Sequence, residues 1–300
     1  FTKQKLYFDS RLNDMTYQLP NMFPIPEHEN FGFYITGTGS EEPFSVLMTD
    51  AIPDLHAVGT KSVGPYFPRY TYREFSTCDD IFSDSGEKVD YVRIDNITDA
   101  AHAAYQRVYA DPTISKDDIF YYTYGLLHSP EYRERFAADL KKSLPRIPKV
   151  RDFRGYAEAG RKLAELHLHY EQVEPYQGIV ETVNGDATGT PPRELYRVTK
   201  MKIPKVKGKP DRSTIVYNNR VTLTNIPEEA YRYQLGARSA IEWIIDRYQV
   251  RVDKASGIVN DPNDWSDDPR YIIDLLKRIV TVSLETMKIV DQLPPLDILE

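Results

Sequence analysis

One segment in the second half of the chain is rich in side chains that bind phosphate. Between Arg193 and Arg220 there are nine basic and two acidic residues, a local balance of +7, although the whole 300-residue sequence carries −7. Lysine ammonium groups are compact cations that suit phosphate oxygens, so this distribution predicts nucleic-acid contacts by one part of an otherwise acidic protein. The predicted contact residues are Lys200, Lys202, Lys205, Lys207, Lys209, Arg212, Asn218 and Arg220.

The same segment holds side chains that can distinguish bases. Arginine and asparagine make bidentate hydrogen bonds to guanine and adenine in the major groove. If this segment meets DNA, as the family resemblance given below implies, the five lysines are predicted to contact phosphates, and Arg212, Asn218, Asn219 and Arg220 to contact base edges. A second interpretation is a solvated, lysine-rich hairpin in which Asn218 only serves a tight turn with left-handed backbone. Gly208 allows the loop between the lysines to protrude.

A second basic cluster precedes this segment. We interpret it as charge compensation at the carboxyl end of a helix, combined with packing contacts to other parts of a larger enzyme. Its members are Lys141, Lys142, Arg146, Lys149, Arg151 and Arg154.

Motifs for catalysis are weak or absent. Asn260-Asp261-Pro262-Asn263-Asp264-Trp265 lacks the second proline of an adenine-methyltransferase loop, and a helix-capping turn explains it better. Gly37-Thr38-Gly39 leads into another strand, which favours a hairpin turn over a nucleotide-binding loop. The sequence has no GxxxxGK[ST] motif, and His167 and His169 point to different faces of a predicted helix. We expect no catalytic residue, metal site or cofactor in this chain by itself, and treat its own enzymatic activity as uncertain.

The composition is that of an ordinary globular protein, with 41% hydrophobic and 28% charged residues. A single cysteine, Cys78, excludes an internal disulfide and suits a reducing cytoplasm. No stretch approaches the roughly 20 apolar residues that span a bilayer. The start at Phe1, without a leader-like pattern, suggests a domain excised from a longer chain. The 22 tyrosines suit either a tyrosine-rich core or half-buried interface positions.

The spacing of apolar residues predicts mixed α+β structure that positions these segments. Short aromatic runs in the first hundred residues predict strands at 31–36, 44–49 and 67–72, with a surface loop at 76–90. From Thr98 the period becomes helical, with a capping box at Ser115 and Asp118 and a restart at Ser129-Pro130. Further helices are expected around 153–166 and 269–292.

The lysine-rich segment is predicted to be strand-like. We expect a loop or hairpin tip over residues 174–192, strands at 195–203, 213–217 and 220–224, and a turn at Asn218-Asn219. On this basis we divide the chain into a β-rich lobe, residues 1–110, and a helical or mixed lobe with an inserted hairpin or small sheet, residues 111–300.

Several blocks of the sequence resemble one known family. The segment 117–148, DDIFYYTYGLLHSPEYRERFAADLKKSLPRIP, resembles a block that follows the methyltransferase core of type ISP restriction–modification enzymes, with a looser version in type IIG enzymes. FTKQKLYFDSRLNDMTYQLPNMFP, DRSTIVYNNRVTLTNIP, SAIEWIIDRYQVRVDKASGIVNDPNDW and PRYIIDLLKRIVTVSLETMKIV are similar to the family in the same order. The sequence departs from the pattern at 234–238 and in the loop 174–192.

The resemblance implies a division of labour within a bacterial defence enzyme. Type ISP enzymes join a nuclease, an ATP-driven translocase, an adenine-N6 methyltransferase and a C-terminal specificity region in one polypeptide. The resemblance identifies this chain with the specificity region, so its expected partners are duplex DNA and the upstream domains, with the lobe 1–110 adjoining the methyltransferase. S-adenosylmethionine, ATP and magnesium would belong to the parent enzyme. The alternative is a docking domain that orders those domains without reading DNA.

Overall fold

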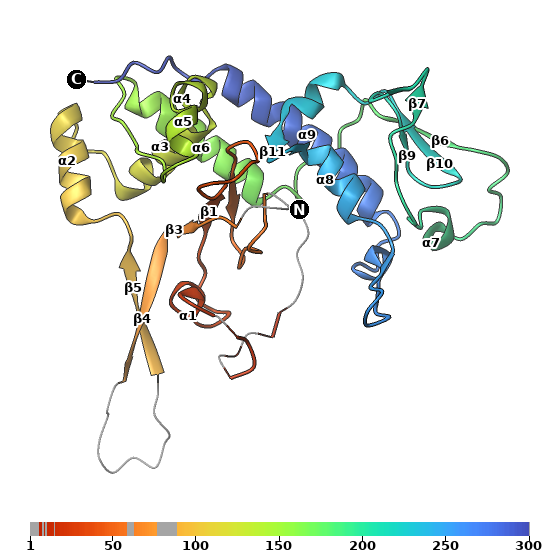
Figure 1. Ribbon diagram of the computed structural model, residues 1–300, viewed down its shortest axis with the longest axis horizontal. Helices are drawn as coiled ribbons and strands as arrows, with labels where there is room; N and C mark the ends of the chain where they lie inside the picture. Colours follow the sequence, from red (N-terminus) through yellow and green to blue (C-terminus); the bar gives the residue numbers. More distant parts are fainter. Residues whose placement is uncertain are drawn as a thin grey trace, which may run out of the picture. The chain divides into compact units, whose positions relative to one another are not determined.

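The computed structural model describes residues 6, 7, 9, 11–14, 16–58, 63–76 and 89–299. Contacts divide them into two units. The N-terminal unit comprises the described residues up to Leu168 and the tail from Leu293, and the C-terminal unit is His169–Gln292. Both units combine helices with small antiparallel sheets (Figure 1), so the predicted mixed α+β class is confirmed. Cys78 lies outside the described residues, as does most of the predicted 76–90 loop.

A three-stranded antiparallel sheet in the order β2-β1-β3 lies at the core of the N-terminal unit. All four residues of β1 are buried, which explains its continuous apolar and aromatic sequence. Gly37-Thr38-Gly39 connects β1 to its antiparallel neighbour β2, so the hairpin interpretation is confirmed. The unit begins with α1 (Leu19–Met22), and the three strands are β1 (Gly32–Ile35), β2 (Val46–Thr49) and β3 (Tyr66–Pro68).

A separate hairpin of β4 (Tyr70–Ser76) and β5 (Val89–Asp95) extends downward in Figure 1, with α1 packed beside β4. At its base the buried guanidinium of Arg69 is paired with Asp95 and with Asp117. The same guanidinium lies 4.6 Å from the centre of the Tyr70 ring. This buried cation is therefore neutralised by two carboxylates, which ties the hairpin to the helical layer.

The helices of the N-terminal unit begin where the capping residues predict. Thr98 caps α2, and Ser115 and Asp118 form both bonds of the predicted capping box of α3. Val108 is exposed, although the sequence pattern places it inward. The helix after Ser129 ends at Phe136 and a short one follows. The helices are α2 (Asp99–Tyr109), α3 (Lys116–His128), α4 (Pro130–Arg135), α5 (Ala137–Leu140) and α6 (Phe153–Leu168).

Helices α3 and α6 approach each other through glycine. A Cβ on Gly160 would lie 1.8 Å from the backbone oxygen of Tyr121, and a Cβ on Gly125 would lie 2.3 Å from that of Tyr156. The two backbones can be this close only because neither position carries a side chain.

Tyrosine hydroxyls hold the irregular segments of this unit to the helices. The buried side chains of Tyr122, Tyr132 and Tyr156 donate to the carbonyl oxygens of Pro148, Arg146 and Pro294 at 2.6–2.8 Å. The tail is held further by the antiparallel bridge between Val150 and Ile298. These tyrosines belong to the core, in agreement with the first of the two sequence interpretations.

In the C-terminal unit a second three-stranded sheet, in the order β6-β10-β9, carries the lysine-rich segment. The predicted strands at 213–217 and 220–224 are present and paired. Its strands and helices are β6 (Val180–Val183), α7 (Pro192–Leu195), β7 (Lys205–Val206), β8 (Lys209–Pro210), β9 (Ile215–Val216), β10 (Val221–Thr224), η1 (Glu228–Arg232), β11 (Gln234–Leu235), β12 (Arg238–Ser239), α8 (Ala240–Arg247), β13 (Arg251–Val252), β14 (Val259–Asn260), η2 (Pro262–Asp264) and α9 (Tyr271–Asp291).

The long helix α9 provides the core of the C-terminal unit. It buries one apolar face that includes Ile272, Leu276 and Ile279, close to the helix predicted over 269–292. Helix α8 and the 3-10 turn η1 pack on it. Ser239 and Glu242 form a full capping box at the start of α8.

One sequence prediction in this unit is wrong, and another is incomplete. Residues 195–203 form no strand beyond an isolated bridge at Lys202, because the carbonyl oxygens of Leu195 and Arg197 accept bonds from a side chain instead of a neighbouring strand. The predicted 174–192 loop contains β6, whose residues pair with β10 about forty positions further on. Its side chains are mostly exposed, so it lacks the alternating apolar pattern of a half-buried strand.

Two buried histidines make the N-terminal unit sensitive to acid. His167 and the hydroxyl of Tyr124 lie 2.6 Å apart, and the rings of His128 and His167 are 5.6 Å apart. Burial lowers the pKa of His167 to about 3 and holds the pKa of His128 well below its usual range. Both rings are therefore neutral in the folded protein at pH 7.

Lowering the pH from 7.5 to 5 should reduce the free energy of unfolding. Below its pKa near 6.5 a histidine is protonated in the unfolded state, whereas the buried ring stays neutral in the folded state. The free energy of unfolding therefore has its full value above about pH 6.5 and declines below it. At pH 5 the loss is about 2 kcal/mol for each histidine. Urea denaturation at the two pH values measures it. His167→Gln should reduce the pH dependence, whereas His56→Gln, at an exposed site, should leave it unchanged; equal pH dependence in all three proteins would contradict the assignment.

Candidate nucleic-acid interface

The β7-β8 hairpin, residues 205–210 and here called the lysine hairpin, is exposed along its whole length. Its turn residues Lys207 and Gly208 both have left-handed backbone, with φ of 50° and 82°. Two successive positive φ angles are the mark of a type I′ turn, whose twist matches that of the paired strands. The hairpin therefore projects Lys205, Lys207 and Lys209 into solvent.

Of the other two lysines of the segment, Lys202 lies at the edge of the β6-β10-β9 sheet. Lys202 forms an antiparallel bridge with Val216 through two backbone hydrogen bonds of 3.0 and 2.9 Å. Lys200 and Lys202 are exposed. Among the described residues, no carboxylate lies within ion-pair distance of any of the five lysines. Their charge is therefore available to an external anion.

The arginines of the same segment are held by the protein itself. Arg212 lies 3.7 Å from a carboxylate oxygen of Glu242, with its guanidinium 5.3 Å from the centre of the Tyr231 ring. Arg220 lies 3.8 Å from Glu194 and donates to the hydroxyl of Thr190 at 3.1 Å. Their side chains are still 46% and 36% exposed, so each guanidinium keeps a solvent-facing part.

The buried amide of Asn218 organises the β9-β10 turn, residues 217–220. Its nitrogen donates to the carbonyl oxygens of Leu195 and Arg197, at 2.8 and 3.0 Å. Its oxygen accepts from the backbone N–H groups of Arg220 and Val221, at 2.8 and 2.7 Å. The left-handed backbone predicted here is absent; among the described residues after 110, positive φ outside glycine occurs at Lys207 and Asn225.

This geometry gives Asn218 a structural role. Its nitrogen and oxygen already form two hydrogen bonds each, so a base would have to displace bonds that hold the turn. Asn218 as a base contact thus remains an untested prediction that the geometry does not favour. An asparagine that accepts from the N–H groups two and three residues later is a turn pattern that sequence reasoning can recognise.

The support beneath the sheet is a group of charges on β6 and α9. Glu181 accepts from Arg270 at 3.1 and 3.0 Å and from Lys277 at 2.9 Å. Partial burial alone would raise the pKa of Glu181, but these bonds outweigh it and lower the pKa to about 2. The outer strand of the sheet is thereby fixed to the long helix.

Comparison with known proteins identifies the family. Residues 1–275 match the type ISP C-terminal specificity domain. The chain belongs to this family. No curated protein sequence matches it.

Solved type ISP enzymes share this fold. A nuclease-deletion mutant of the type ISP enzyme LlaGI, in complex with a DNA substrate mimic, is 39% identical with a TM-score of 0.77. The ATP-dependent type ISP enzyme LlaBIII bound to DNA is 36% identical with a TM-score of 0.82. In each case 98% of this chain aligns, with 24% of LlaGI and 18% of LlaBIII.

A third structure, the DrdV–DNA complex, is 34% identical with a TM-score of 0.79, and 96% of this chain aligns with 27% of that one. The chain thus spans about a quarter or less of the length of these proteins.

The motifs resembling catalytic loops have structural roles in this specificity domain. Asp261 caps the 3-10 turn η2, and Asn263 exchanges hydrogen bonds with the backbone of Val198. No group of three or more potential metal ligands occurs among the described residues. Within the same part of the chain, no helix is both long and apolar enough to cross a membrane.

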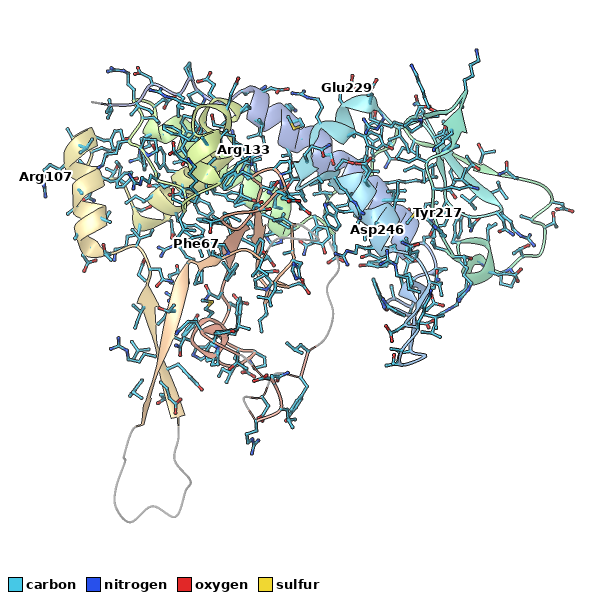
Figure 2. All side chains as sticks on the ribbon, viewed as in Figure 1. Phe67, Arg107, Arg133, Tyr217, Glu229 and Asp246 are labelled. Carbon is cyan, nitrogen blue, oxygen red and sulfur yellow. The ribbon has the colours of Figure 1, made fainter. Side chains whose placement is uncertain are left out.

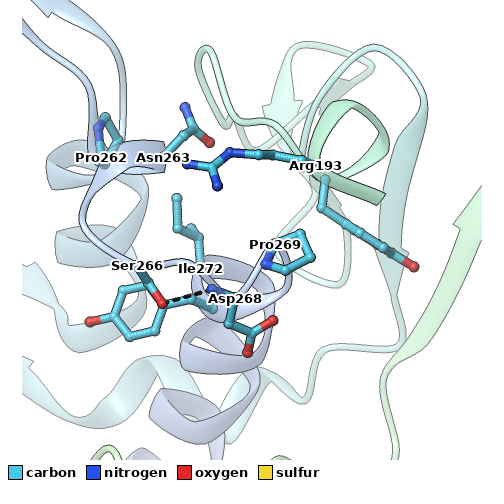
Figure 3. Close-up of a pocket in the computed structure, with 9 residues that line it drawn as sticks. Arg193, Pro262, Asn263, Ser266, Asp268, Pro269 and Ile272 are labelled. Atoms are coloured by element: carbon cyan, nitrogen blue, oxygen red, sulfur yellow. Dashed lines mark hydrogen bonds between the residues drawn. The ribbon is translucent and has the colours of Figure 1, made fainter. Parts of the chain in front are cut away.

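A pocket next to the basic segment is too small for a base or nucleotide. It is lined by Arg193, Tyr196, Asn263, Ser266 and Asp268 among others, and Figure 3 shows Arg193 extending toward Asn263. Its interior of about 10 Å³ is near the minimum that admits one water molecule.

The second basic cluster divides into paired and free residues. Arg154 pairs with Asp111 and Asp118, and Arg151 pairs with Asp297. These contacts fasten segments of the N-terminal unit to one another, and the predicted packing against other parts of a larger enzyme stays a prediction. Lys149 lies over the Tyr105 ring at 5.4 Å. The exposed residues without an acidic partner in the described part of the chain are Lys141, Lys142 and Arg146.

Asn218→Ala should destabilise the C-terminal unit. The substitution leaves two part-buried carbonyl groups and two backbone N–H groups without their partner, and each such group costs about 1–3 kcal/mol unless water reaches it. We expect the free energy of unfolding to fall by roughly 2–4 kcal/mol in urea denaturation. Asn219→Ala at the exposed neighbouring position is the matched control and should stay within about 0.5 kcal/mol of the parent. A small, equal effect of both changes would refute the structural role of Asn218.

Proposed function

We propose that this specificity domain recognises a duplex DNA sequence on behalf of a larger restriction–modification enzyme. The observation that carries the proposal is the exposed run of five lysines without acidic partners among the described residues, in a chain whose net charge is −7. Relatives of the same family have been solved with DNA or a DNA substrate mimic. Unpaired ammonium groups on a projecting hairpin are suited to phosphate oxygens on both sides of a groove.

The physical division of roles follows from how each side chain is held. The lysines move freely and supply an attraction that does not depend on sequence. Arg212 and Arg220 are oriented by Tyr231, Glu242, Thr190 and Glu194, so they lose little side-chain entropy on binding. An oriented guanidinium suits bidentate contact with guanine, and these two arginines are the proposed guanine contacts.

The chemistry of the proposed parent lies outside this chain. We infer that an adenine-N6 methyltransferase and an ATP-dependent translocase and nuclease act in the same cytoplasmic polypeptide, and that these domains bind S-adenosylmethionine, ATP and magnesium. The inference is supported by LlaBIII, an ATP-dependent enzyme of which this chain matches 18% of the length. The specificity domain would position DNA, and the lobe 1–110 would adjoin the methyltransferase.

A docking role is the second candidate, and one observation favours it. A groove of about 430 Å³ in the N-terminal unit has an apolar lining from Tyr132, Phe136, Leu140 and Ile298, while Leu144 beside them is 49% exposed. Exposed apolar surface of this kind is typical of contacts between domains. Docking through this groove and DNA binding through the lysine hairpin use different units and are compatible.

Removing one hairpin lysine should weaken binding to every DNA sequence alike. For Lys205→Ala or Lys207→Ala in the intact enzyme, the slope of log affinity against log salt concentration should decrease in magnitude by about one unit, because one phosphate contact is lost. Fluorescence anisotropy with duplex DNA at several salt concentrations measures it. Lys162→Ala is the control, since Lys162 is paired with Glu158 on a helix of the N-terminal unit. Unchanged slopes for both hairpin variants would exclude the hairpin as the phosphate-binding surface.

Exchange of the whole region tests the function directly. Replacing this chain in the intact enzyme by the corresponding region of a relative with another target should move methylation to the relative's site. Sequencing of methylated DNA reads this out. Methylation that remains at the original site would refute sequence recognition by this domain and leave the docking role.

A further inference from the structure

Two adjacent asparagines in the β9-β10 turn have opposite surroundings. Asn218 is 8% exposed and bonded at both ends of its amide. Asn219 is exposed, and its amide has no hydrogen-bond partner among the described residues. The carboxamide of Asn218 is thus bonded to the backbone around the turn, whereas the carboxamide of Asn219 faces solvent.

The backbone that carries Asn219 is fixed on both sides. Before it, the N–H groups of Tyr217 and Asn218 donate to the carbonyl oxygen of Val221 at 3.0 and 3.2 Å. After it, the carbonyl oxygen of Arg220 accepts from the N–H of Asn184 at 2.6 Å. The buried Tyr217, labelled in Figure 2, also donates its hydroxyl to the carbonyl oxygen of Tyr196 at 3.0 Å.

This rigidity matters because a contact made by a preorganised side chain loses less entropy. Only the short side chain of Asn219 remains to be ordered when a ligand binds. A second loop is fastened to the same turn, since Arg220 reaches Thr190 and the side chain of Asn184 donates to the hydroxyl of Thr222 at 3.1 Å. Asn219 therefore lies on a turn whose backbone is fixed by hydrogen bonds on both sides.

The amide of Asn219 lies close along the chain to one of the free lysines. Lys202 is bridged to Val216, three residues before Asn219. Since even an extended chain rises only about 3.3 Å per residue, Asn219 lies within about 10 Å of Val216. The major groove is about 12 Å wide, so a lysine bound to a phosphate at the groove edge would leave the amide of Asn219 within reach of base edges.

We propose that Asn219 is a specificity-determining residue that contacts an adenine in the major groove, and that Asn218 positions it. The carboxamide supplies one acceptor and one donor side by side, which matches the N6 amino group and N7 of adenine. The inference rests on the proposed function, because it concerns how the DNA-binding domain reads sequence. Of the two asparagines predicted as base contacts, it keeps Asn219 in that role and gives Asn218 a positioning role.

The test is the target preference of the intact enzyme that contains this chain. A duplex library randomised over the recognition site is methylated by the parent protein and by Asn219→Ala, and the products are sequenced. At one position the preference for adenine should fall roughly 5- to 150-fold, the range for one bidentate contact. The salt slope of binding should not change, because no phosphate contact is lost.

Matched variants separate the possible failures. Gln292→Ala removes another exposed carboxamide, just beyond the end of α9, and should leave the preference unchanged. Asn219→Asp keeps the shape and an acceptor but loses the donor to N7, so it should also reduce the adenine preference. An unaltered preference in both Asn219 variants would overturn the inference, whereas a parent enzyme without any preference would overturn the proposed function.

Discussion

The carboxylate of Glu181 fixes the β6-β10-β9 sheet of the C-terminal unit, and with it the β9-β10 turn and the lysine hairpin. It is partly buried between Arg270 and Lys277, and removing one of these charges from such a site leaves the others uncompensated. Because Glu181 belongs to β6, its bonds to the α9 side fix the outer strand, and β10 and β9 follow by pairing. The lysine hairpin, whose residues are all exposed, and the β9-β10 turn take their positions from this sheet.

The two kinds of basic residue are treated differently by the fold. Arginines in the basic segment are placed next to carboxylates and aromatic rings, whereas lysines are left in solvent. Each guanidinium is thus oriented by its neighbours, and the nearby carboxylates partly offset its positive charge. Each ammonium group has no such neighbours, so its charge is not offset and its side chain is not oriented. Under the proposed function, such a surface would separate attraction to phosphate groups from recognition of bases, although the residues alternate along one short stretch of sequence.

The sequence predicted structure correctly where the hydrogen bonds of an element join residues that are close together in the chain. The capping box of Ser115 and Asp118 forms as predicted, because its bonds join residues three apart. Strand β6 was missed, because its pairing depends on residues about forty positions away and its own side chains are mostly exposed. The basic segment was found from composition alone. The distinction between Asn218 and Asn219 could not be predicted, because both have the same chemistry and only the surrounding carbonyl groups decide which is buried.

The order of the two units along the chain has a consequence for how such proteins diversify. Within the described residues, the C-terminal unit is one continuous stretch, and the N-terminal unit resumes after it with a short tail anchored to Val150, Tyr156 and Glu131. A unit that is inserted into its neighbour is bounded by two junctions, at 168/169 and 292/293. Recombination at both junctions would exchange the C-terminal unit as a whole and leave both parts of the N-terminal unit, before 168/169 and after 292/293, in place. A single crossover would instead separate the N-terminal unit from its tail, so inheritance of a foreign C-terminal unit requires the paired exchange.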